Sequence, residues 1–108
     1  MIYILLFLLT EAQHAKELAQ ELQGQTEVRL WDRTRVDILT KEYAYEVDWA
    51  SKWAESIGQS LYYAELTGKK PGIILLCKKN EGRFIYRAQT VCAKHNIKLI
   101  IRWIKDDN

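Results

Sequence analysis

The spacing of apolar residues changes several times along the chain, and each change predicts a boundary between secondary-structure elements. Between Thr10 and Gln23 apolar residues recur at three- and four-residue steps, which is typical of a helix. Thr10 is a residue type that caps helix starts, and Gly24 is one that ends helices. Beyond Gly24 the pattern becomes alternation, which predicts strands over residues 25–31, 34–39 and 42–49.

The second half of the chain predicts helices that alternate with strands. Residues 50–67 favour a long helix that ends at Gly68, with a packing stripe formed by Trp53, Ile57, Leu61 and Ala64. The run Ile73–Cys77 suits a strand buried on both faces, residues 81–95 favour a helix, and residues 97–103 favour a last strand. The order α-β-β-β-α-β-α-β predicts an α/β protein with a mixed sheet flanked by helices. Both late crossovers are expected to be right-handed if they join parallel neighbours.

Length and composition fit a single globular domain over residues 1–108. Apolar residues make up 48% of the chain and charged residues 28%, which are ordinary values for a protein that buries one core. The net charge of +2 permits binding to nucleic acid but is smaller than a dedicated binder usually carries. Cys77 and Cys92 lack the spacing of a metal site, and Cys77 is expected to be a buried thiol.

The apolar run from Ile2 to Leu9 has two interpretations. It is too short to span a bilayer, and no other stretch is a membrane candidate, so no membrane partner is expected. It resembles the centre of a signal peptide covering residues 1–12, cleaved near Ala12 or Ala15, which would make the protein exported. No Lys or Arg precedes the run, which favours instead a buried strand or helix start in a cytoplasmic protein.

The predicted hairpin between the second and third strands concentrates acidic residues. If its turn is symmetric about Lys41 and Glu42, Asp37 lies directly opposite Glu46, and Asp48 shares their face two residues further on. Like charges placed in this way destabilise a sheet unless a cation compensates. A Mg²⁺ ion, which uses one or two carboxylates together with water and phosphate oxygens, would compensate, and so would a nearby Lys or Arg.

Further polar residues are expected close to these acids. Glu27 adds a fourth acid on the first strand, and Lys52, Gln59 and Tyr63 project from the helix that follows the hairpin. An isolated Asp and Glu on neighbouring strands are usually solvated surface residues. The combination of the acids with the helix and its Gln–Tyr pair favours a functional site.

This pattern resembles the PD-(D/E)XK, or restriction-endonuclease-like, nuclease superfamily, whose core has the order α-β-β-β-α-β. The spacing of Gln59 and Tyr63 is similar to that of its RecB-like branch, and the chain also resembles a group of small bacterial and phage proteins. The resemblance covers roughly residues 10–78 and rests on Arg35-Val36-Asp37, Glu46-Val47-Asp48, Lys52, Gly58-Gln59 and Tyr63. It implies a nuclease in which Asp37 and Glu46 bind metal and Gln59 and Tyr63 orient the substrate.

The sequence departs from the superfamily at the position two residues after the second acid, where the motif has Lys and this chain has Asp48. Lys52, Arg29 or Arg35 would then offset the charge that develops on the phosphate. The expected cofactor is Mg²⁺ or Mn²⁺, bound by Asp37, Glu46, Asp48 and Glu27. The expected partner is DNA, and a homodimer is compatible with the small size of the chain. The alternatives are a catalytically inactive module that binds nucleic acid or protein, and an exported protein of unrelated role.

Overall fold

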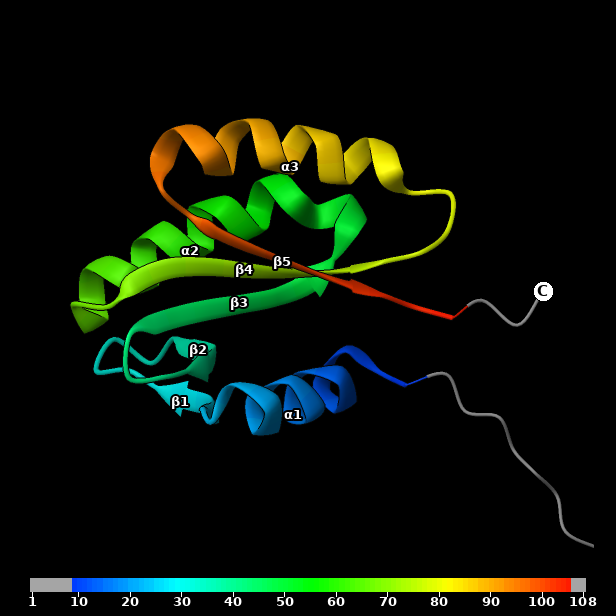
Figure 1. The fold of residues 1–108 in the computed structure, drawn as a ribbon. Coiled ribbons are helices and arrows are strands. Elements are labelled where there is room, and N and C mark those ends of the chain that lie inside the picture. Colours follow the sequence, from blue (N-terminus) through cyan, green and yellow to red (C-terminus); the bar gives the residue numbers. More distant parts are fainter. Residues whose placement is uncertain (1–8, 106–108) are drawn as a thin grey trace, which may run out of the picture.

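A computed structural model describes residues 9–105, which form a five-stranded sheet with helices on both faces (Figure 1). The strand order is β1-β2-β3-β4-β5; the first three strands are antiparallel and the last three parallel. The α/β class with a mixed sheet is therefore confirmed. The elements are α1 (Glu11–Leu22), β1 (Gln25–Arg29), β2 (Arg35–Leu39), β3 (Tyr43–Trp49), a 3₁₀ turn (Ala50–Lys52), α2 (Trp53–Thr67), β4 (Lys70–Cys77), α3 (Gly82–His95) and β5 (Lys98–Trp103).

Helix α1 begins where the sequence predicts it. The Thr10 hydroxyl accepts a hydrogen bond from the Gln13 backbone, and the Gln13 side chain accepts one from the Thr10 backbone, so a full capping box fixes the start. The helix ends at Leu22, two residues before Gly24, because Gln23 adopts the left-handed conformation of the C-cap. The apolar run at residues 1–8, on which the signal-peptide alternative rests, lies outside the described residues.

Two apolar layers enclose the parallel half of the sheet. Ile74 and Leu76 of β4 pack toward α1, whereas Ile73, Leu75 and Cys77 pack toward α3, so β4 is buried on both faces as predicted. Glycine at position 72 of this strand leaves room for the Tyr45 ring, since a Cβ there would lie 2.4 Å from it. Cys77 and Cys92 are buried free thiols. Within residues 9–105, no helix combines the length and apolar character needed to cross a membrane.

Helix α2 buries only part of the predicted stripe: Trp53 and Ile57 pack against the core beside β4, as expected. Leu61 is 42% exposed, while Ser56, Ser60 and Tyr63 face the sheet. The serine hydroxyls donate to the carbonyls of Lys52 and Ile57 within the helix, so these small polar residues can be buried without unsatisfied groups. The two serines are part of the buried face of the helix, which an apolar pattern does not reveal.

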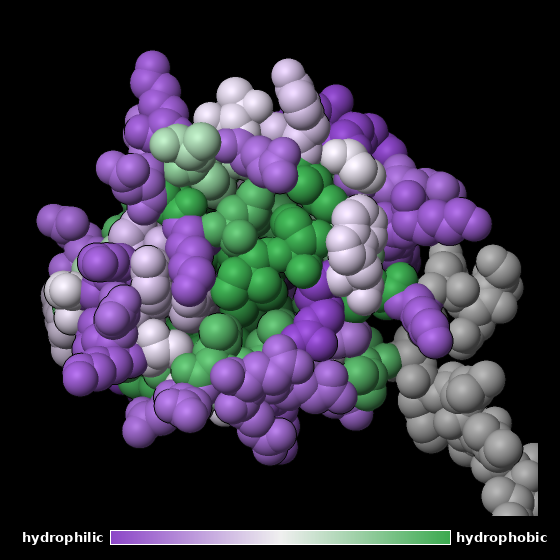
Figure 2. Space-filling view, in the orientation of Figure 1, coloured by the Kyte–Doolittle hydropathy of each residue, from purple (hydrophilic) through white to green (hydrophobic). Residues whose placement is uncertain are grey.

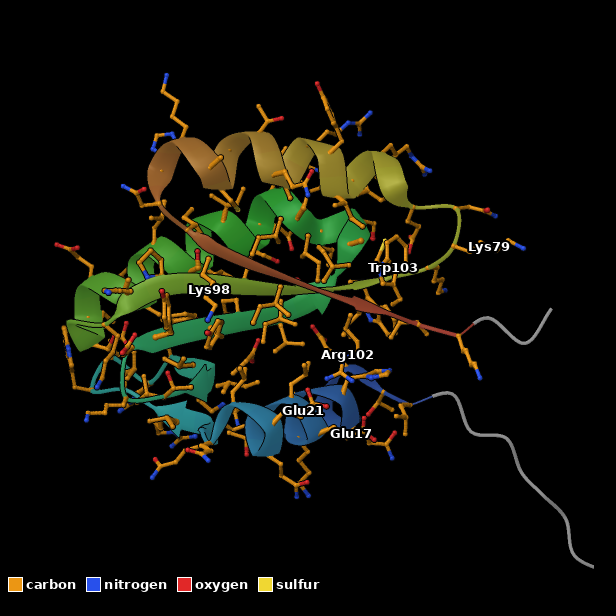
Figure 3. The ribbon with its side chains drawn as sticks, viewed as in Figure 1. Glu17, Glu21, Lys79, Lys98, Arg102 and Trp103 are labelled. Carbon is orange, nitrogen blue, oxygen red and sulfur yellow. The ribbon has the colours of Figure 1, made fainter. Side chains whose placement is uncertain are left out.

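Strand β5 forms the outer edge of the parallel half, and one ion pair joins it to α1. Arg102 of β5 is paired with Glu21 of α1 (Figure 3). At the other end of β5, the Lys98 ammonium lies 4.7 Å from the centre of the Tyr43 ring, which stacks on Tyr45. These contacts place Lys98 and Arg102 on the α1 side of the sheet.

Candidate functional site

The backbone pairing of β2 with β3 ends at Ile38, and beyond it, at Asp37, the two strands are joined by hydrogen bonds from side chains to the backbone. The paired residues are Leu39 with Ala44 and Ile38 with Tyr45, a register that places Asp37 opposite Glu46 as the symmetric turn predicts. The Asp37 carboxylate accepts a hydrogen bond from the Val47 backbone N–H at 2.8 Å. The Glu46 carboxylate lies 3.5 Å from the Asp37 backbone nitrogen, which donates to it. Each acid is thus positioned by the backbone of the other strand.

The β1–β2 hairpin changes face at this same point. Thr26 pairs with Ile38 and Val28 pairs with Val36, which leaves Glu27 opposite Asp37 with a left-handed φ of 50°. Ile38 packs toward α1, whereas Val36 packs against Tyr63 of α2. Val36 and Ile38 are both buried, as the alternation along β2 predicts, but they pack into different parts of the core. Asp37 and Glu27 both line a pocket beside α1.

The start of α1 adds an acid that the sequence interpretation missed. The Glu11 carboxyl, in the first turn of α1, lies beside Asp48, and the charges of Asp37 and Lys52 also reach it. We call Glu11, Glu27, Asp37, Glu46 and Asp48 the acidic cluster. The capping box at Thr10 fixes where α1 begins, but only the packing of α1 across the sheet shows that its first turn meets the end of β3.

Burial and mutual repulsion hold protons in the acidic cluster. Burial, together with the neighbouring charge of Asp37, raises the pKa of Glu46 to about 9, and Glu46 is only 6% exposed. Burial and the adjacent Asp48 raise the pKa of Glu11 to about 7. The pKa of Asp37 is raised too, chiefly by burial, although its bond from Val47 opposes the shift. Within residues 9–105 the one ion pair is Arg102–Glu21, so no Lys or Arg neutralises the cluster through a direct contact.

A pocket of about 370 Å³ opens between α1 and the parted strands. Three members of the acidic cluster line it, alongside a lysine and several polar and small groups. Its lining comprises Glu11, Ala12, Gln13, Ala15, Lys16, Thr26, Glu27, Asp37 and Val47. The acids therefore border a space large enough for a small polar group such as a phosphate.

The residues predicted on α2 lie at different distances from the acids. Tyr63 is 9% exposed, and the charges of Glu46 and Asp37 contribute, after burial, to raising its pKa. Lys52 is exposed at the end of the 3₁₀ turn, and its charge offsets a small part of the rise in the pKa of Glu11. Gln59 is exposed one helical turn before Tyr63. Tyr63 and Lys52 are thus beside the acidic cluster, while no contact joins Gln59 to it among the described residues.

The two predicted substrate-binding arginines stand next to each other. Arg29 and Arg35 are directly paired across β1 and β2, and both are exposed. At the tip of the same hairpin Trp31 is 82% exposed. The tip is held in place because Asp32 accepts hydrogen bonds from Thr34 and from the Tyr62 hydroxyl of α2. A fixed basic surface with an exposed indole therefore adjoins Glu27 and Asp37.

The acidic cluster suits a divalent ion held by two carboxylates. Among residues 9–105 no three His, Cys, Asp or Glu side chains meet closely enough to form a metal site on their own. The structure instead brings acids together in pairs, Asp37 with Glu46 and Glu11 with Asp48. Mg²⁺ commonly takes one or two protein carboxylates and completes its shell with water and phosphate oxygens. The pair formed by Asp37 and Glu46 fits that requirement.

Comparisons with known proteins add no family to this description. No protein-family model, curated protein or solved structure matches the chain.

Proposed function

We propose that this protein is a metal-dependent phosphodiesterase acting on DNA, with a restriction-endonuclease-like core. The observation that carries the proposal is the arrangement of Asp37 and Glu46 across the parted strands. Their carboxyls are fixed by backbone N–H groups and have no basic partner among the described residues. Burial raises the pKa of both, and the charge of Asp37 adds to the rise in the pKa of Glu46. Acids whose pKa values are perturbed by burial and by a specific charged neighbour cluster at functional sites.

Asp37 and Glu46 would hold the divalent ion, Mg²⁺ or Mn²⁺, with Asp48 and Glu27 close by. When bound, such an ion supplies positive charge that lowers the pKa of an attacking water and neutralises the phosphate. Glu11, with a pKa near 7, can carry or release a proton at neutral pH and is placed to exchange one with Asp48. The pocket along α1 leaves space for the reacting phosphate next to Asp37.

The chain's own cations would bind the rest of the substrate. Lys52 lies near Glu11, at the end of the 3₁₀ turn that follows β3, and would replace in function the lysine whose motif position is taken by Asp48. The arginine pair on β1 and β2 would bind backbone phosphates, since two like charges placed directly opposite each other are stabilised by an anion between them. Trp31 offers an exposed ring on which an unpaired base can stack.

The deciding experiment is cleavage of a labelled DNA duplex and of its single strand with Mg²⁺ or Mn²⁺. We expect cleavage by the wild type and a loss of at least about 100-fold in Asp37→Ala and Glu46→Ala, since each removes a metal ligand. Glu65→Ala, which changes an exposed acid on α2, should keep full activity. Absence of both metal-dependent cleavage and metal binding by calorimetry in pure wild-type protein would reject the proposal.

Asp48 favours one alternative, a module that binds DNA without cutting it, because the motif lysine is missing. DNA binding measured in Ca²⁺ separates the two. Replacing both Arg29 and Arg35 by Ala should lower the slope of log affinity against log salt by about 2, one for each phosphate contact. Binding with that salt dependence but no cleavage in Mg²⁺ or Mn²⁺ would establish the alternative.

A further inference from the structure

The two edges of the sheet are protected to very different degrees. At the β1 edge, Glu27 interrupts the strand with a left-handed φ, and exposed Glu27 and Arg29 carry charge. Both features are ways in which proteins prevent an edge strand from pairing with another chain. At the β5 edge the residues Leu99, Ile100 and Ile101 form a continuous, partly exposed apolar run without a bulge or a proline.

Figure 2 shows apolar surface gathered where β5 crosses the molecule between α3 and α1, with polar residues around it. On the α3 side this surface contains a groove of about 420 Å³ lined by Gln89, Cys92, Ala93, Ile97, Leu99 and Ile101. On the α1 side lies Ile100, between Lys98 and Arg102. An exposed apolar patch over an unpaired strand edge marks an interaction surface.

The backbone of β5 shows which residues can pair outward. The Ile104 N–H donates to the Cys77 carbonyl of β4, so residues of the same parity, Lys98, Ile100 and Arg102, direct their backbone groups toward β4. The N–H and C=O groups of Leu99, Ile101 and Trp103 therefore point away from the sheet. No strand within residues 9–105 pairs with them.

We propose that the protein forms a twofold dimer in which β5 pairs antiparallel with β5 of a second copy, with Ile100 opposite Ile100. In this register Leu99 lies opposite Ile101 of the other copy, and these two residues have the outward backbone groups that a hydrogen-bonded antiparallel pair requires. Apolar side chains then meet apolar side chains on both faces of a ten-stranded sheet, and each copy covers the groove of the other.

Charge complementarity supports a second copy as the occupant. In this register Lys98 lies opposite Arg102 of the other copy, on the α1 side of the sheet. Arg102 is already paired with Glu21, and Glu17 lies one helical turn before Glu21 on α1 (Figure 3). The two acids thus meet two bases, Arg102 from their own chain and Lys98 from the other. A shift of two residues would instead place Ile100 against Arg102 and lose this match.

Cysteine cross-linking tests the register. In Ile100→Cys the two introduced thiols would face each other as a non-hydrogen-bonded pair, with Cα atoms about 4.5 Å apart, within the range that a disulfide spans. Mild oxidation should therefore link this variant into a covalent dimer. Leu99→Cys should not link to itself, but a mixture of Leu99→Cys and Ile101→Cys should. The wild type controls for Cys77 and Cys92, which are buried.

Sedimentation of the wild type tests the dimer itself. Ile100→Lys places two charges against each other at the symmetry axis and should raise the dissociation constant about 100-fold or more. Leu61→Lys introduces the same charge at a partly exposed position on α2 and should leave the dimer intact. A wild type that sediments as a monomer at 100 μM (the order of magnitude at which weak dimers form), or Leu99→Cys cross-linking faster than Ile100→Cys, overturns the proposal. A monomer that captures a different protein through β5 would do the same.

Discussion

The two halves of the sheet pair their strands in opposite ways. From β3 to β5 the parallel ladders continue without interruption, and the central strand β4 carries apolar side chains on both faces from Ile73 to Cys77. From β1 to β3 the ladders break where Glu27, Asp37 and Glu46 come together. In the first half the backbone fixes where the side chains lie; in the second, acidic side chains bond to the backbone and fix the strands.

This difference shows which half of the sheet stabilises the fold and which half holds the destabilising acidic residues. Buried, unpaired acids oppose folding, so the acidic cluster depends on free energy from elsewhere in the molecule. The parallel half supplies it through β4, of which five consecutive side chains are fully buried. If this comparison is right, substitutions in the two halves should change stability in opposite directions.

The largest expected effect is in the parallel half. Leu75→Ala removes a side chain with no exposed surface and leaves a cavity, and it should lower the free energy of unfolding by about 2–5 kcal/mol. Leu61→Ala, at a partly exposed position, should change it by less than about 1 kcal/mol. Urea unfolding of both variants measures the difference. Equal losses in the two would show that β4 is not the main source of stability.

In the acidic half we expect the opposite sign. At pH 8 Glu46 is ionised in the unfolded chain and must take up a proton on folding, and Glu46→Gln removes this requirement. The variant should raise the free energy of unfolding by about 1–3 kcal/mol, while weakening Mn²⁺ binding. Glu65→Gln, an exposed acid on α2, is the matched control and should be neutral. A destabilised Glu46→Gln that still binds Mn²⁺ normally would mean that Glu46 serves only to hold β2 and β3 together.

The pH dependence of stability follows from the same group. Glu46 keeps its proton up to about pH 9 in the folded protein but loses it near its ordinary pKa of 4.5 when unfolded, so folding takes up a proton between these values. The raised pKa values of Glu11 and Asp37 act in the same direction. The free energy of unfolding should therefore fall as pH rises from about 4.5 to 9. Denaturation curves at several pH values should show this fall in the wild type, a shallower one in Glu46→Gln, and a smaller one with Mn²⁺ present. A wild type whose stability rises over this range would contradict the buried, protonated state of Glu46.

Much of this comparison could be predicted from the sequence, and the rest could not for identifiable reasons. The alternating runs and the symmetric turn place Asp37 opposite Glu46, and the apolar run of β4 indicates a strand buried on both faces. The change of face at Glu27 and Asp37 depends on a left-handed residue that is not glycine, and periodicity does not reveal such a residue. The position of Glu11 depends on how α1 crosses the sheet, which is a tertiary property. The burial of Ser56 and Ser60 on α2 could not be predicted, because a buried residue with a small hydroxyl does not stand out in a pattern of apolar positions.

The smallest expected effect connects the two halves through α1. This helix packs on Ile74 and Leu76 of the parallel half and at the same time carries Glu11 into the acidic cluster. Thr10→Ala removes one side of the capping box and should cost about 1 kcal/mol of stability. Because the first turn also positions Glu11 beside Asp48, the variant should shift the pKa of Glu11 from about 7 toward its ordinary value, as followed by NMR titration of the carboxyl carbon. Thr90→Ala, which removes a hydroxyl bonded within α3, should change neither quantity by more than a small amount. A loss of stability without any shift at Glu11 would show that the cap supports the fold alone, and that the position of Glu11 is fixed by the packing of α1 against the sheet.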